Sequence, residues 1–139
     1  MKQLTTLLLS LMTISLLFIS CGEKKDSNFL LEGKWVYFQK GIESKDVAVL
    51  EPYLHESKCG KNYVEFLKDG IVKQGIYSYS EDCDLEIDSG TWFKKKDKIT
   101  SVFSKAGKEI SEIISLDETT LQVKAKVNNE TVIYVFKKL

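Results

Sequence analysis

Apolar and polar residues alternate along most of the chain after residue 29. The clearest case is LQVKAKV (121–127), in which every second residue is apolar. An alternation of period two predicts a β-strand with one buried and one solvated face. Strand signals also occur at 30–39, at 62–80 as two runs around Lys68-Asp69-Gly70, and at 84–95, 98–105, 109–116 and 131–138.

Eight such strands, joined by short turns with no long helix between them, predict antiparallel neighbours. Eight is also a number of strands at which an antiparallel meander can close on itself. We therefore expect an all-β fold, an eight-stranded antiparallel up-and-down barrel. A two-sheet sandwich is the alternative, and the only long connection available to it is 40–61. Within that connection, 46–57 contains the sole proline, Pro52, and predicts an irregular loop with one helical turn.

The N-terminus has the pattern of a targeting segment. An apolar run ends in FISC, and it is too short, and too soon followed by charge, for a membrane-spanning helix. Ser20 followed by Cys21 resembles the lipobox of bacterial lipoproteins. The resemblance implies that Cys21 is lipidated; an uncleaved anchor and a plain secreted protein are the alternatives. The chain then divides into a lipoprotein signal peptide (1–20), a lipid-anchored tether (21–28) and a barrel domain (29–139).

Setting Cys21 aside leaves two cysteines, Cys59 and Cys83. Export into an oxidising compartment favours a disulfide between them. Two free buried thiols are the alternative, because cysteine is often buried as a small apolar residue.

Charge and composition argue against several functions. All 20 basic residues are lysine, and 20 acidic residues balance them, so no basic face for nucleic acid is indicated. Without arginine, a phosphate-binding enzyme is disfavoured. The only histidine, His55, lies in no pattern of a nucleophile and its base, and EDCDLEID (81–88) does not fit the EF-hand spacing. We expect no catalytic residues, no metal site, no cofactor and no enzymatic activity.

A set of short motifs is spread over the predicted strands. They are LEGKW (31–35), Cys59, FLKDG (66–70), Cys83 and GTW (90–92). Together they resemble the lipocalin-like lipoproteins of Bacteroidetes-type bacteria and, more distantly, the lipocalins. The resemblance implies that Gly33 permits close packing and that Trp35 plugs the closed end of the barrel. In lipocalins an arginine of the last strand lies over this tryptophan, and this chain has no arginine.

The alternation leaves open on which face of its strand the second tryptophan, Trp92, lies. Leu85 and Ile87 share one face of the strand 84–95, and Trp92 has the opposite parity. A bulge at Ser89-Gly90 would bring Trp92 into the interior and bend the strand. Without a bulge, the ring faces outward and becomes a candidate for partner contact.

The sequence leaves two functions open. The first is a membrane-anchored barrel that binds a small hydrophobic ligand. The residues expected to line its cavity are Ile114, Val123, Ala125, Tyr134, Phe136 and Trp92. The second is a structural or interaction lipoprotein with a filled barrel, which binds an envelope protein through the loop 40–61. In both cases we expect a monomer, lipid-anchored in the bacterial cell envelope at the outer membrane and facing the periplasm or the surface.

Overall fold

The computed structural model describes residues 30–45, 47–55, 58–78 and 82–139. The predicted signal peptide, the lipidation site Cys21 and the tether 21–28 lie outside these residues. The described chain is almost entirely β-structure, and its strands are β1 (Gly33–Ser44), β2 (Val47–Ala48), β3 (Glu51–Pro52), β4 (Tyr63–Phe66), β5 (Ile71–Tyr77), β6 (Leu85–Lys95), β7 (Lys98–Phe103), β8 (Gly107–Leu116), β9 (Thr120–Val127) and β10 (Glu130–Lys138). No helix in this part of the chain is long and apolar enough to cross a membrane.

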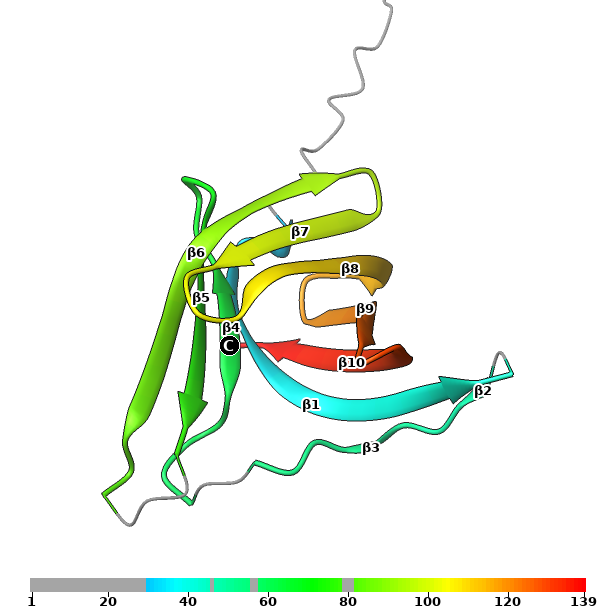
Figure 1. Cartoon of the computed structure of the whole chain (residues 1–139), viewed down its shortest axis with the longest axis horizontal. Helices are drawn as coiled ribbons and strands as arrows, with labels where there is room; N and C mark the ends of the chain where they lie inside the picture. Colours follow the sequence, from blue (N-terminus) through cyan, green and yellow to red (C-terminus); the bar gives the residue numbers. More distant parts are fainter. Residues whose placement is uncertain (1–29, 46, 56–57, 79–81) are drawn as a thin grey trace, which may run out of the picture.

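The eight longer strands form a closed antiparallel barrel. From β4 to β10 each strand pairs with the next, β4 pairs with β1, and β10 returns to pair with β1. Figure 1 shows the sheet curving round until the last strand lies beside the first. The predicted eight-stranded barrel is confirmed, and closure by the β1–β10 pair rules out the sandwich.

The connection after β1 differs from its prediction. Residues 47–48 and 51–52 are extended and pair with β1, where an irregular loop with a helical turn was expected. Gly41 of β1 lets the segment 47–52 approach β1 closely, because a Cβ at this position would lie 2.5 Å from the carbonyl oxygen of Val49. The pairing satisfies backbone groups of β1 beyond the reach of β4, which ends its contact at Val36.

One end of the barrel is filled by large apolar side chains, and we call it the closed end. Leu31, Trp35 and Val72 are completely buried there, and Trp92 is 8% exposed. The Trp35 indole Nε1 donates to the Leu31 carbonyl at 2.7 Å, so this large ring is buried with its single donor satisfied.

Lys138, in the last strand, completes the closed end. Its ammonium lies 4.9 Å from the centre of the Trp35 ring and donates to the Leu30 carbonyl at 3.0 Å. Gly33, at φ +122°, leaves room for this side chain, because a Cβ there would lie 2.7 Å from Lys138 Cε. A lysine therefore covers the tryptophan, in the place where the family resemblance led us to look for an arginine.

The loops at the opposite end, which we call the mouth, are tied down by covalent and polar contacts. Cys59 and Cys83 form the predicted disulfide, with Cα atoms 5.2 Å apart. His55 Nδ1 accepts the backbone N–H of Asn62, and its Nε2 donates to the carbonyl of Tyr37. The only histidine thus joins a loop to β1.

Candidate ligand-binding site

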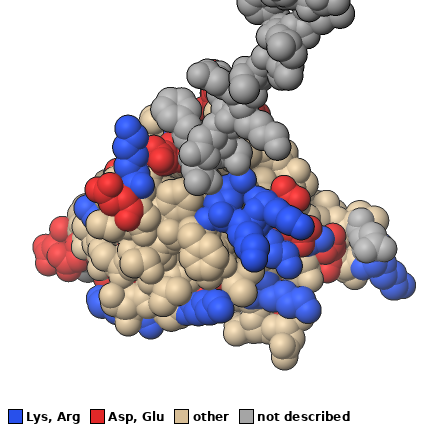
Figure 2. All heavy atoms as spheres, turned by 90° about the horizontal axis from the view of Figure 1, so that it is seen from above, with Lys and Arg blue, Asp and Glu red and all other residues tan. Residues whose placement is uncertain are grey.

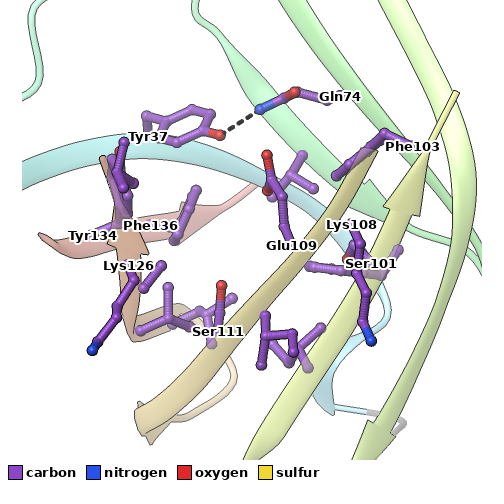
Figure 3. Close-up of a pocket in the computed structure, with 18 of the residues that line it drawn as sticks. Tyr37, Gln74, Ser101, Phe103, Lys108, Glu109, Ser111, Lys126, Tyr134 and Phe136 are labelled. Atoms are coloured by element: carbon purple, nitrogen blue, oxygen red, sulfur yellow. Dashed lines mark hydrogen bonds between the residues drawn. The ribbon is translucent and has the colours of Figure 1, made fainter. Parts of the chain in front are cut away.

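The barrel interior is not completely filled. A cavity of about 430 Å³ lies between the closed end and the mouth (Figure 3). Its lining residues are Tyr37, Val64, Phe66, Gln74, Ile99, Ser101, Phe103, Lys108, Glu109, Ile110, Ser111, Leu121, Val123, Ala125, Lys126, Val127, Asn128, Tyr134 and Phe136. Most of these come from inward positions of β7 to β10.

An aromatic wall covers one side of the cavity. The Tyr37 ring of β1 is 4.6 Å from Phe136 and 5.7 Å from Tyr134, both on β10. Tyr53, which follows β3, stacks on Tyr37 at 4.8 Å. These contacts hold the rings at defined angles, so the wall is already formed when a ligand arrives.

Polar groups face the same space from the other side. Gln74 of β5 donates to the Tyr37 hydroxyl at 2.9 Å. Desolvation raises the pKa of Tyr37, so its hydroxyl stays neutral at physiological pH. Ser101 and Ser111 supply further hydroxyls to the lining.

Glu109 is the acidic residue of the cavity wall. Figure 3 shows its carboxylate pointing across the cavity toward Tyr37 and Gln74, whereas the amine ends of Lys108 and Lys126 point away from it. Loss of hydration inside the barrel, followed by the charge of Asp88, raises the pKa of Glu109. The Glu109 side chain is nevertheless exposed, so its carboxylate keeps part of its hydration.

Four of the six residues expected to line a cavity do so, namely Val123, Ala125, Tyr134 and Phe136. Ile114 does not, and this prediction is wrong. The register between β8 and β9 shifts after the Ile113–Val123 pair and resumes with Ser115 opposite Gln122. Ile114 is the extra residue of this bulge, faces outward and is 47% exposed.

Trp92 is inside the barrel but does not line the cavity. Its Nε1 donates to the Leu67 carbonyl at 3.0 Å, and its ring lies 5.2 Å from Phe66 in an edge-to-face contact. Of the two alternatives for this strand neither is right as stated: the bulge at Ser89-Gly90 is absent, since β6 pairs in unbroken register with both neighbours, and the Trp92 ring is nevertheless buried.

The two faces of β6 were assigned the wrong way round. Leu85 and Ile87, which we expected inside, are 38% and 48% exposed, and Asp88 lies on the inward face with Trp92. Asp88 can face inward because its carboxylate accepts the backbone N–H groups of Lys105 at 3.1 Å and Ala106 at 2.9 Å. The inward face of β6 therefore carries Trp92 and a buried acid that holds the turn before β8.

The rest of the acidic run stays at the surface. Asp82, Asp84 and Glu86 are exposed, and Glu86 pairs with Lys105. Within the described part of the chain, no three acidic, histidine or cysteine side chains group in a way that could hold a metal ion.

Sequence reasoning missed the polar residues of the cavity, among them Gln74 and Glu109. In β8 apolar residues occur on both parities, at Ile110 and Ile114 as well as at Ile113. The alternation therefore did not indicate which face is inside. Pairing Ile113 with Val123, on the clearly alternating strand β9, would have placed Glu109 and Ser111 in the interior.

The fold and the cavity define a class: a closed up-and-down barrel, plugged at one end by tryptophan and hollow toward the other. The sequence model of the family described as a lipocalin-like domain matches residues 31–123. The chain therefore belongs to the lipocalin-like family, which confirms the resemblance found in its motifs.

Solved structures share this fold at low sequence identity. A lipocalin-like protein from Bacteroides uniformis ATCC 8492 is 17% identical, with a TM-score of 0.58 over 79% of this chain and 99% of that chain. A protein from Bacteroides eggerthii DSM 20697, at 13% identity, has a TM-score of 0.54 over 78% and 98%. Lobster apocrustacyanin A1, at 16% identity, has a TM-score of 0.53 over 84% and 65%. No curated protein sequence matches the chain.

Proposed function

We propose that this chain is an envelope lipoprotein whose barrel binds a small hydrophobic ligand. The cavity of about 430 Å³ carries the proposal, because most of its lining residues are aromatic or aliphatic. Its size lies within the range of small-molecule sites, about 300–1,000 Å³. The lipocalin-like fold typically serves such binding rather than catalysis, and the proposal includes no enzymatic activity.

Filling the cavity tests the proposal. Wild type is titrated with N-phenyl-1-naphthylamine, a neutral apolar probe that fluoresces when it leaves water. Ala125→Phe places a ring inside the barrel, because Ala125 lines the cavity. We expect saturable binding by wild type and at least a tenfold loss of affinity in this variant, about 1.4 kcal/mol.

The matched control is Lys124→Phe, which adds the same ring at the neighbouring outward position of β9. It should bind the probe as wild type does. Circular dichroism establishes that each variant is folded. Equal binding by Ala125→Phe and wild type would place the probe outside the cavity and contradict the proposal.

We also propose that Cys21 carries the lipid that holds the barrel at the bacterial outer membrane. The sequence before it supports this, because a small residue precedes the cysteine at the end of the apolar run. Two or three acyl chains anchor a protein stably, whereas one binds only marginally. Cells fed labelled palmitate should label wild type and not Cys21→Ser. Equal labelling of the two would contradict lipidation at this position.

Binding of an envelope protein is the second candidate function. The segment that covers β1 exposes several apolar side chains, including Val47 at 67%, Val49 at 71% and Leu54 at 84%. Apolar groups exposed together often mark a contact surface. Crosslinking in cells followed by affinity purification should recover one partner with wild type and lose it with Val49→Ser/Leu54→Ser. Recovery of no specific partner would exclude this candidate.

A further inference from the structure

Glu109 has no counter-ion in the described structure. It forms no hydrogen bond and no ion pair with any described residue, and it faces a cavity in which most, though not all, of the lining residues are apolar or aromatic. The two lysines of the lining do not neutralise it, since their amine ends point away (Figure 3). A carboxylate in such surroundings has lost part of its hydration without gaining a partner.

A second acid strengthens the negative potential at this position. Asp88 is 9% exposed and faces inward from β6, and its charge contributes to the raised pKa of Glu109. The direct partners of Asp88 are backbone N–H groups of the turn before β8, which carry no charge, and the charge of Asp88 also acts on the exposed ammonium of Lys105, which pairs with Glu86. A cation placed beside Glu109 would relieve both the desolvation and the repulsion.

The aromatic wall suits the same kind of ligand. The cavity brings Glu109 together with the rings of Tyr37 and Tyr134, whose pKa values are raised mainly by desolvation and to a smaller extent by neighbouring groups that include Glu109. The faces of aromatic rings attract cations, and their area packs against an apolar ligand. Tyr37 is already fixed by Gln74 and by its stacked neighbour Tyr53.

We propose that the cavity takes a small cationic amphiphile, a protonated amine carried on an apolar ring system. The amine lies against the carboxylate of Glu109, and the ring system packs between Tyr37, Tyr134 and Phe136. The proposal rests on the ligand-binding function above and names the chemical class of the ligand.

Three compounds with one common body test the charge preference. They are 1-naphthylmethylamine, 1-naphthalenemethanol and 1-naphthoic acid, which are cationic, neutral and anionic at pH 7. Isothermal titration calorimetry measures their affinity for wild type. We expect the amine to bind about tenfold more tightly than the alcohol, and the acid to bind most weakly, as a charge-assisted contact predicts.

Glu109→Gln removes the charge and keeps the shape of the side chain. The amine should lose its tenfold advantage in this variant, while the alcohol binds as before. Glu112→Gln is the matched control, because Glu112 is exposed on the same strand and faces outward opposite Lys98. Glu109→Asp, which keeps the charge, should retain part of the preference.

The outcomes separate this inference from the general function. Equal binding of all three compounds to wild type would overturn the charge preference and leave ligand binding intact. An amine preference that survives Glu109→Gln would overturn the assignment to this residue. If none of the three binds, both the inference and the proposed function are contradicted.

Discussion

The two ends of the barrel share eight strands but differ in how their inward groups are satisfied. At the closed end, the indole donors of Trp35 and Trp92 and the ammonium of Lys138 all meet backbone carbonyls. Toward the mouth, Glu109 faces the cavity without a partner among the residues that the structure describes, and Val127 and Asn128 are exposed. The polar groups named at the closed end are satisfied by contacts within the protein, whereas the cavity keeps a polar group that is available to a ligand.

This difference comes from side-chain size and not from the backbone. Tryptophans at inward positions of β1 and β6 fill the closed end, while alanine, serine and valine at inward positions of β8 and β9 leave space. Large buried side chains contribute most to stability, and partly hydrated polar groups contribute little or oppose it. We infer that stability is concentrated at the closed end and binding at the cavity.

The outer surface adds a third environment. Phe93 and Val102 point away from the core and are 58% and 45% exposed, and Ile110, which also borders the cavity, is 50% exposed. Seen from above, the molecule presents a broad uncharged area with lysines gathered beside it (Figure 2). Apolar residues thus occur on both faces of β6 to β8, which is why alternation alone misassigned β6.

The largest effect should come from Trp35→Ala. Removing a fully buried indole leaves a cavity at the closed end, and we expect the free energy of unfolding to fall by about 3–5 kcal/mol in urea denaturation. Tyr134→Ala, in the half-buried cavity wall, should cost about 1 kcal/mol but weaken probe binding more than Trp35→Ala does. Equal stability losses in the two variants would remove the distinction between the ends.

Removing the disulfide should have the next largest effect on stability. Cys59 and Cys83 are 24 residues apart, and a loop of that length contributes about 3 kcal/mol in the chain-entropy account. The double variant Cys59→Ser/Cys83→Ser should therefore unfold at lower urea concentration while keeping its affinity for the naphthyl probe. Reduction of wild type should reproduce the shift; a loss of probe binding would show that the disulfide also shapes the cavity.

Lys138→Met should have a smaller effect. The variant keeps an apolar stem over Trp35 but leaves the Leu30 carbonyl without its donor, at a cost of about 1 kcal/mol. Lys137→Met is the control on the exposed neighbour, and we expect it to cost about half as much or less. Thermal unfolding of the pair measures the difference, and equal values would mean that Lys138 does not stabilise the closed end.

Glu109→Gln should have the smallest effect on stability, and this effect should be a gain where the other variants lose stability. Folding raises the pKa of Glu109, so the folded state is favoured while the side chain is protonated and loses that advantage as pH rises through the raised pKa. Glutamine does not ionise, so the variant should be slightly more stable than wild type at pH 7 and equal to it near pH 4. A loss of stability at pH 7 would indicate a structural role for the carboxylate.

Strand number and order could be predicted from sequence because alternation and turn residues are local signals. The alternation in 121–127 predicted strand β9, and the turn signal at Lys68-Asp69-Gly70 predicted the hairpin of β4 and β5. The short strands β2 and β3 could not be predicted, because two-residue segments have no period. Their pairing depends on a close approach to Gly41 that only the folded chain shows.

The site was less predictable because its residues are positioned by pairing and contacts between strands, which the sequence of a single strand does not show. Ile114 was misplaced by a bulge that its own sequence does not mark, and Trp92 shares the inward face of β6 with Asp88, whose carboxylate holds the turn at Lys105. Glu109 was missed because a charged residue in an alternating strand is normally assigned to the solvated face. Its place in the interior follows from the partner strands of β8.

Native mass spectrometry of the folded domain, purified from its own host without detergent exchange, tests the central claim most directly. We predict a population of wild-type molecules that retain a small-molecule mass, lost on collisional activation and absent from Ala125→Phe prepared in the same way. The bare chain mass alone in wild type, or the same retained mass in both proteins, would contradict a ligand held in the barrel.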